Sequence, residues 1–169
     1  TNLRAFLKER FEWMAHAVHR IDRELIAAVL AADEDDLSGA WDRLGVLRRL
    51  WEPGRDGKRP LLEKAAKVAE RTARIVQSAQ ELELPAQVNA EGLRDPAERE
   101  LWAIWVNEVA PRLREELGQR RYEAAIRTYS ALYPAVHAFF EKVFVMDENL
   151  ELRRNRLALM KEIHSALSE

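Results

Sequence analysis

The sequence predicts an all-α fold, a bundle of six or seven helices. Glycine and proline are scarce, with six of each in 169 residues, and the abundant alanine, leucine, glutamate and arginine favour helix almost throughout. Apolar residues recur at the spacing of a helix face along most of the chain, and no segment alternates with the period of a strand. The 47% hydrophobic and 33% charged composition is typical of a globular protein, and we expect one helical domain over residues 1–169.

Three helices are predicted before the first break. Asn2 can cap a helix that runs to about His19, and Asp22 can cap a second one. The acidic run 33–36 separates the second helix from a third over 37–51. The first helix is expected to bury the apolar side formed by Leu3, Phe6, Leu7, Phe11, Met14 and Val18.

A fourth helix is predicted after a break at 53–57, which contains Pro53-Gly54 and Gly57. Pro60 suits its first turn, and the helix is expected to end near Gln80. Residues 82–94 show no clear period and are expected to form a connection. The helix should bury a stripe formed by Leu61, Ala65, Val68, Thr72, Ile75 and Ala79.

A fifth helix is predicted to start at Asp95-Pro96-Ala97-Glu98, where Asp can cap, Pro takes the first helical position and Glu the third. Pro111 should kink or split this helix, and Gly118 should end it.

The last two helices are predicted over roughly 121–146 and from Asp147, as a cap, to Leu167. The former is expected to bend at Pro134. Its second half is apolar nearly all round, which predicts a position at the centre of the bundle.

Composition excludes several classes of protein. The chain has no cysteine, which rules out disulfides and thiolate metal sites and suits a reducing cytoplasm. No apolar run approaches the roughly 20 residues that span a bilayer, so we expect no membrane partner. The N-terminus from Thr1 lacks a signal-peptide pattern and an initiator Met, and we expect a piece of a longer cytoplasmic protein.

Signals for catalysis are weak. His16 and His19 could bind a metal with Glu12 or Asp22, but no third ligand is compelling, and we expect a surface or half-buried pair. No Gly-rich phosphate loop or His-Glu-x-x-His run is present. We therefore expect a non-catalytic domain. A hydrolase or metal enzyme ranks third, behind RNA binding and protein docking.

A row of cations on the fourth helix is the first candidate RNA-binding feature. At 100° per residue its members fall within an arc of roughly 80° beside the buried stripe, so they could follow a phosphate backbone. Alternatively, they form a solvated face paired with Glu63 and Glu70. Both interpretations stay open for these residues, Lys64, Lys67, Arg71 and Arg74.

Residues 48–59 form a second candidate, with five cations and Trp51 at a break. Unpaired RNA bases stack on aromatic or guanidinium planes, so this composition could bind RNA. For Trp51 we favour a role in completing the apolar face of the third helix. Arg55, Lys58 and Arg59 remain open as RNA contacts.

The last helix carries a basic run at 153–156, whose side chains are expected to point in two different directions. Arg153 and Arg156 point into its apolar arc and are expected to form structural ion pairs, because an unpaired buried charge is costly. Arg154 and Asn155 are expected to face away, where they could contact RNA.

A family resemblance rests on LYPAVHAFFEKVFVM at 132–146 and LRRNRLAL at 152–159. These segments resemble the C-terminal end of the bacterial glycyl-tRNA synthetase β-subunit, with its Val-Asp-Ala-Phe-Phe-Asp-x-Val-Met-Val-Met stretch followed by Leu-Arg-x-Asn-Arg-Leu. This chain departs from the pattern at four positions. His137 replaces Asp, Phe144 replaces Met, Glu70 stands where Lys is typical, and Arg74 stands where Asn is typical.

The resemblance implies a helical anticodon-binding domain of the type shared with arginyl-tRNA synthetases. Its implied partners are glycine tRNA, the remainder of the β-subunit and the α-subunit, with no DNA. The glycine anticodon contains two cytosines, so the implied target is an unpaired, cytosine-containing loop. The resemblance implies no cofactor in this domain, since the parent ligase would use ATP and Mg on the other subunit.

The main alternative is a helical protein–protein docking scaffold without RNA binding. A net charge of −2 suits that alternative, because nucleic-acid modules are usually basic overall.

Overall fold

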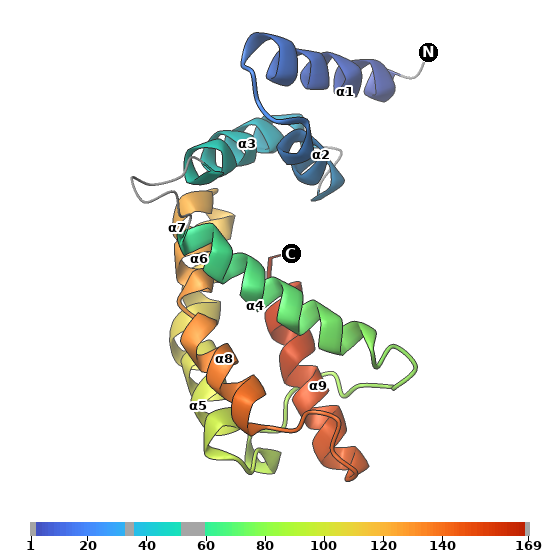
Figure 1. The fold of residues 1–169 in the computed structure, drawn as a ribbon, viewed down its shortest axis with the longest axis vertical. Coiled ribbons are helices and arrows are strands. Elements are labelled where there is room, and N and C mark those ends of the chain that lie inside the picture. The colour runs from blue at the N-terminus through green and yellow to red at the C-terminus, as the bar shows by residue number, and fades with distance from the viewer. Residues whose placement is uncertain (1–2, 33–35, 52–59, 168–169) are drawn as a thin grey trace. The chain divides into compact units, whose positions relative to one another are not determined.

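The computed structural model describes residues 3–32, 36–51 and 60–167 (Figure 1). These residues form α-helices with short π and 3-10 turns and, over the described ranges, no strand, so the predicted all-α fold is confirmed. The chain divides into two compact units, Thr1–Arg59 and Pro60–Glu169. That residues 1–169 act as one domain stays a prediction.

The first unit contains α1 (Leu3–Trp13), a π-helical turn (Met14–Val18), α2 (Arg23–Ala32) and α3 (Leu37–Trp51). Asp22 Oδ1 accepts the Glu24 backbone N–H at 2.9 Å at the start of α2, which confirms the predicted cap. Asp36 Oδ1 caps α3 in the same way and accepts the Gly39 backbone N–H at 2.8 Å. The core consists of Phe11, Ala15, Ile21, Leu25, Ile26, Val29, Leu30, Ala40 and Leu44.

The predicted apolar side of the first helix was wrong except at Phe11. Ala15 is buried with Phe11, one turn away, whereas Leu3 is 70% exposed and Val18 55% exposed. Helical spacing predicts which residues share a face, but burial also requires a packing partner. In the described part of this unit, α1 and its π turn reach the core mainly through Phe11 and Ala15. Asn2, the predicted cap, lies outside the described residues.

The second unit runs from α4 to α9. Its elements are α4 (Pro60–Gln77), η2 (Ala90–Gly92), α5 (Pro96–Ile104), η3 (Trp105–Val109), α6 (Ala110–Gly118), α7 (Tyr122–Ser130), α8 (Tyr133–Lys142) and α9 (Leu150–Ser165). α4 packs on α7, α8 and α9, while α5 packs on α8 and α6 packs on α7 (Figure 1). The largest fully buried side chains here are Trp105, Tyr129, Phe139, Leu101, Leu113, Leu132, Leu157, Leu159, Met160 and Ile163.

Predicted helix boundaries hold where local chemistry sets them. Asp95 Oδ1 accepts the Ala97 N–H at 2.8 Å at the start of α5. The interruption expected at Pro111 is a π turn, Trp105–Val109, which ends two residues before the proline, because proline cannot continue the helical hydrogen bonds. Gly118 ends α6 as predicted.

Three predictions for the chain beyond residue 121 were wrong. The expected helix over 121–146 is two helices, with a break before Pro134, and α8 ends at Lys142. Phe144, placed in the centre of the bundle by the sequence, is 72% exposed. The cap of the last helix is Asn149, whose side chain accepts the Leu152 N–H at 3.1 Å, rather than Asp147.

None of the helices in the described ranges combines the length and apolar composition needed to cross a membrane.

Candidate nucleic-acid interface

The row of cations predicted on α4 lies beside the buried stripe of that helix. Val68 and Thr72 are fully buried, and the Thr72 hydroxyl donates to the Val68 carbonyl at 2.9 Å. This fixes which side of α4 faces the core. The predicted cations therefore lie along its flank, with Lys64, Lys67 and Arg74 exposed and Arg71 half-buried.

Helix α8 brings aromatic rings to the same flank. Lys67 Nζ lies 5.8 Å from the Tyr133 ring centroid, and the Arg71 guanidinium carbon lies 5.6 Å from that of Phe140. Both distances are within the range of cation–π attraction. The five residues Lys67, Arg71, Tyr133, His137 and Phe140 are called the basic–aromatic face below.

His137 links the two helices of this face. Its Nδ1 lies 3.1 Å from Arg71 Nη1, and a guanidinium can only donate, so Nδ1 is the acceptor in this contact. Tyr133, one turn earlier on α8, stacks on His137 at a centroid distance of 5.8 Å and an interplanar angle of 7°. Nε2 lies 3.9 Å from Glu141 Oε1. The imidazole therefore holds Arg71 in place while its own ring stays partly exposed.

Arg74 differs from Arg71 in its partner. Its Nη2 lies 2.5 Å from Glu70 Oε1, one turn earlier on α4, and both side chains are largely exposed. For Arg74 the structure thus shows the ion pairing with Glu70 that the sequence left open. Exposed pairs of this kind are weak, so a phosphate could still compete for Arg74.

Arg156 is buried in an ion cluster. Its side chain is 7% exposed and pairs with the fully buried Glu98 and with Asp147 Oδ2, the latter at 2.9 Å from Nη1. Nη1 also donates to the Phe144 carbonyl at 2.8 Å. Arg153 Nε donates to the Asp147 carbonyl at 2.6 Å. These contacts join α5, α9 and the segment between α8 and α9.

The same cluster controls the acidity of Asp147. The Asn149 backbone N–H donates to its carboxylate and is the largest cause that lowers the pKa of Asp147. Desolvation opposes this shift, and Arg156 and Arg153 add to it.

Asn155 does not face away from the bundle, so that prediction was wrong. It is 5% exposed, its Oδ1 accepts the Asn89 N–H at 2.8 Å, and its Nδ2 donates to the Asn89 carbonyl at 2.8 Å. The side chain thus ties α9 to the connection after α4. Arg154 is half-buried, and its Nε is buried without a protein acceptor.

The remaining predicted candidates belong to the first unit. Arg55, Lys58 and Arg59 lie outside the described residues, and Trp51, at the end of α3, is 41% exposed. Over the described ranges, no group of three His, Asp or Glu side chains could hold a metal. His16 Nδ1 lies 3.0 Å from the Ile21 carbonyl.

The aromatic half of the face was missed at the sequence level. Tyr133, His137 and Phe140 follow helical spacing and could have been recognised as one side of a helix. The sequence around them is apolar nearly all round, and such a pattern indicates a central helix and not an exposed binding side.

Comparison with known proteins covers most of the chain. The family model described as DALR anticodon binding domain matches residues 66–169, which include the whole basic–aromatic face. A glycine–tRNA ligase beta subunit of Anaeromyxobacter dehalogenans is 37% identical over 154 residues, which is 89% of this chain and 20% of that protein. Beta subunits from Acidobacterium capsulatum and Myxococcus xanthus are 33% and 31% identical, each over 97% of this chain. The chain spans about a fifth of the length of these relatives.

Proposed function

Because this chain belongs to the family of DALR anticodon-binding domains, we propose that its basic–aromatic face binds the anticodon loop of a transfer RNA. The observation that carries this proposal is the position of Arg71, which contacts both His137 and the Phe140 ring. A cation fixed among partly exposed rings offers charge to phosphates and flat surfaces to bases.

The face suits unpaired nucleotides better than a duplex. Bases in a loop are free to stack on aromatic rings or guanidinium planes, and each such contact stabilises binding by about 1–3 kcal/mol. The parallel rings of Tyr133 and His137 provide one such surface. Lys67 and Arg71 lie beside it and can neutralise the phosphates of the same loop.

We further propose that the RNA is glycine tRNA and that the chain serves as the C-terminal domain of a glycyl-tRNA synthetase β-subunit. The similar proteins are glycine–tRNA ligase beta subunits, and glycine anticodons carry two cytosines whose edges are open to direct reading. In this proposal the domain works with the rest of the β-subunit and with the α-subunit in the cytoplasm. ATP and Mg act on the α-subunit, and this domain needs no cofactor.

The test is fluorescence anisotropy of a labelled glycine anticodon stem-loop, titrated with the 169-residue chain at two salt concentrations. A stem-loop with both cytosines replaced is titrated beside it. We expect tighter, salt-sensitive binding to the cytosine version and at least about a tenfold loss for the double variant Lys67→Met/Arg71→Met.

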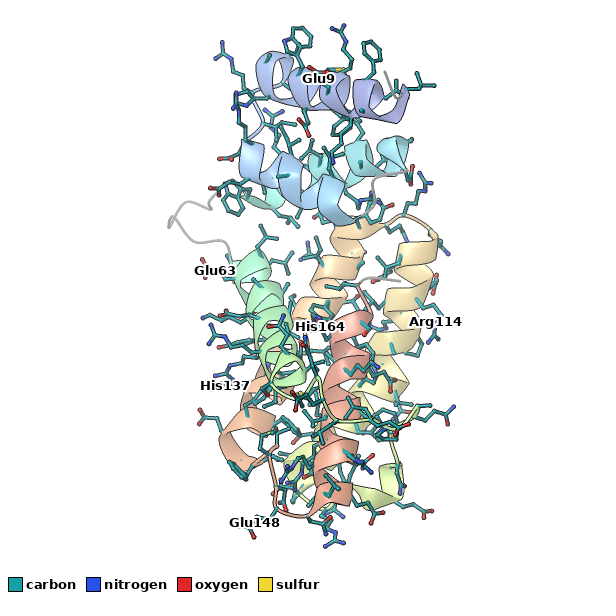
Figure 2. All side chains as sticks on the ribbon, turned by 90° about the vertical axis from the view of Figure 1, so that its right-hand side faces the viewer. Glu9, Glu63, Arg114, His137, Glu148 and His164 are labelled. Atoms are coloured by element: carbon teal, nitrogen blue, oxygen red, sulfur yellow. The ribbon has the colours of Figure 1, made fainter. Side chains whose placement is uncertain are left out.

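The matched control for this experiment is Arg114→Met. Arg114 is exposed on α6, and Figure 2 shows it on the opposite edge of the second unit from His137. Its substitution removes one positive charge, where the double variant removes two, and should change affinity less than about twofold. Equal losses for both variants, or no binding by the unaltered chain, would contradict the proposed face.

A second function, docking onto another protein, is favoured by α1. Leu3, Phe6 and Val18 are 49–70% exposed, although the sequence pattern of α1 is that of a buried helix face. In this alternative, Phe6→Ser with Val18→Ser would abolish association with the synthetase α-subunit and leave stem-loop binding unchanged. If the double variant keeps both association and stem-loop binding, the support for docking is removed.

A further inference from the structure

The second unit contains a cleft on a different pair of segments from the basic–aromatic face. It has a volume of about 670 Å³ and lies between the connection after α4 and the first turns of α9. Leu84, Pro85, Leu150 and Leu152 provide apolar lining, and Arg94 and Arg154 provide positive charge. Glu83 and Glu151 also line it. Figure 1 shows the connection after α4 passing alongside α9.

The two walls of this cleft are fixed to each other. The Asn155 side chain forms two hydrogen bonds, both of 2.8 Å, with the backbone of Asn89. Asn89 Oδ1 in turn accepts the Glu91 and Gly92 N–H groups, at 3.1 and 3.3 Å. A Cβ at Gly92 would lie only 3.2 Å from Asn155 Nδ2. The cleft is therefore formed before any ligand arrives, which lowers the entropic cost of binding.

Arg154 lines this cleft and has an unsatisfied donor. Its Nε is buried and has no protein acceptor, whereas Arg153 and Arg156 on the same helix donate to Asp147 and Glu98. A guanidinium is always charged, and a buried donor without an acceptor is costly. Because the side chain as a whole is only half-buried, a turn of the guanidinium into the cleft would bring this donor to an acceptor atom of a ligand and remove the cost.

We propose that this cleft takes one unpaired nucleotide of the bound RNA, with an acceptor of the base or phosphate on Arg154. This inference rests on the proposed function. A nucleobase has flat apolar faces, which suit the leucine and proline lining, and an edge with both donors and acceptors, which suits the arginines and the glutamates. A free anion would use only the arginines and would leave the apolar lining and the two carboxylates without a role.

The Asn149-capped end of α9 adds to this site. Backbone N–H groups in the first turn of a helix carry partial positive charge, which favours a phosphate beside Arg154. Asn149 itself lines the cleft, and its Oδ1 is occupied by the Leu152 N–H. The helix end thus supports the arginine and does not replace it.

The experiment compares Arg154→Met with Arg114→Met in stem-loop anisotropy with the 169-residue chain. Methionine keeps much of the apolar stem of Arg154 and removes every donor. We expect Arg154→Met to weaken stem-loop binding about tenfold, as for one lost charge-assisted hydrogen bond, and Arg114→Met to weaken it less than about twofold. Circular dichroism of each variant checks that it is folded.

A second measurement follows Arg154 in the unaltered chain. In a ¹H–¹⁵N spectrum of the unaltered chain, the Arg154 Nε–H resonance, assigned by comparison with Arg154→Lys, should shift when the stem-loop is added. Inorganic phosphate alone should not shift it at a similar concentration; an equal shift with phosphate would indicate an anion site and overturn the nucleotide proposal.

The outcomes separate this inference from the proposed function. If the unaltered chain binds the stem-loop, but Arg154→Met behaves like Arg114→Met and the resonance stays in place, the cleft proposal is overturned and the basic–aromatic face stands. If the unaltered chain does not bind the stem-loop, both fail. If Lys67→Met/Arg71→Met and Arg154→Met each weaken binding, both are supported.

Discussion

Arg71 Nη1 and His137 Nδ1 lie 3.1 Å apart and join α4 to α8 across 66 positions of sequence. The acceptor in this contact is an imidazole nitrogen, which carries no negative charge, so the contact holds the arginine without neutralising it. Arg74, one turn of α4 away, is instead paired with the Glu70 carboxylate. Two arginines on one helix face therefore offer different net charge to an incoming phosphate.

The first prediction concerns His137→Asp. A carboxylate at this position would still hold Arg71 but would neutralise it, so we expect weaker stem-loop binding, by roughly 1 kcal/mol. The slope of log affinity against log salt should also fall by about one. His137→Gln is the control, because its amide can accept from Arg71 without adding charge. Equal affinities for the two variants in anisotropy would show that the charge state of this residue has no effect on RNA binding.

The second prediction concerns Glu70→Gln. Removing this carboxylate releases Arg74 from its ion pair, so RNA affinity and its salt dependence should both rise, the slope by about one. Stability should change by less than about 0.5 kcal/mol, because the pair is exposed. Glu141→Gln, on the neighbouring α8, provides a comparison with a carboxylate 3.9 Å from His137. An unchanged salt slope for Glu70→Gln would indicate that Arg74 does not contact RNA.

Local sequence predicted that the cations of the basic–aromatic face share one flank of α4, but not that aromatic rings lie beside them. The positions of Lys67 and Arg71 follow from the period of α4 alone, because the buried side of one helix determines its flanks. That α8 packs against this flank depends on contacts between residues far apart in sequence. A helical period does not contain that information.

Polar side chains near the start of α9 show the same limit. Projection onto a helical wheel placed Asn155 outside the apolar arc, yet it is buried because the connection after α4 passes over it and offers both backbone groups of Asn89. Asp147 was expected to cap α9, but it is bound by Arg156, and Asn149 caps the helix instead. In each case a tertiary partner decides between roles that local chemistry leaves equally available.

The third prediction concerns the buried pair of Arg156 and Glu98. Arg156→Met leaves the fully buried Glu98 carboxylate with no charge partner, and we expect a loss of about 3–5 kcal/mol in the free energy of unfolding. Glu98→Gln alone should also lower the free energy of unfolding. The double variant Arg156→Met/Glu98→Gln should lose less than the sum of the two single losses. Urea unfolding of all four proteins measures this coupling. Additive losses would mean that the two residues contribute independently.

The fourth prediction concerns acid stability. Because the folded-state pKa of Asp147 is lowered from 3.8, its contribution is present above that ordinary value and is lost as the pH falls through the folded-state pKa. Asp147→Asn removes this titration, so its stability should depend less on pH between about pH 5 and about pH 2. Thermal unfolding across this range tests the difference. Parallel curves for the two proteins would contradict it.

The fifth prediction concerns alkaline stability. Burial raises the pKa of Tyr129 to about 12, against a smaller lowering by its hydrogen bond with Thr72. The folded state therefore keeps the phenol proton at a pH where the unfolded chain, with an ordinary value of 10.0, has lost it. The stability due to this group is present below pH 10 and is lost as the pH rises towards about 12, by on the order of 2–3 kcal/mol.

Tyr129→Phe measures this effect directly, because it keeps the ring in the core and removes the titrating group. At about pH 8 the variant should be less stable by roughly 1 kcal/mol, since it lacks the phenol hydrogen bonds. At about pH 11 the unaltered chain should have lost that advantage, because only its stability falls with ionisation of this residue. Urea unfolding at both values, followed by circular dichroism, gives the comparison. A constant difference between the two proteins would mean that Tyr129 ionises as easily in the folded state as in the unfolded one.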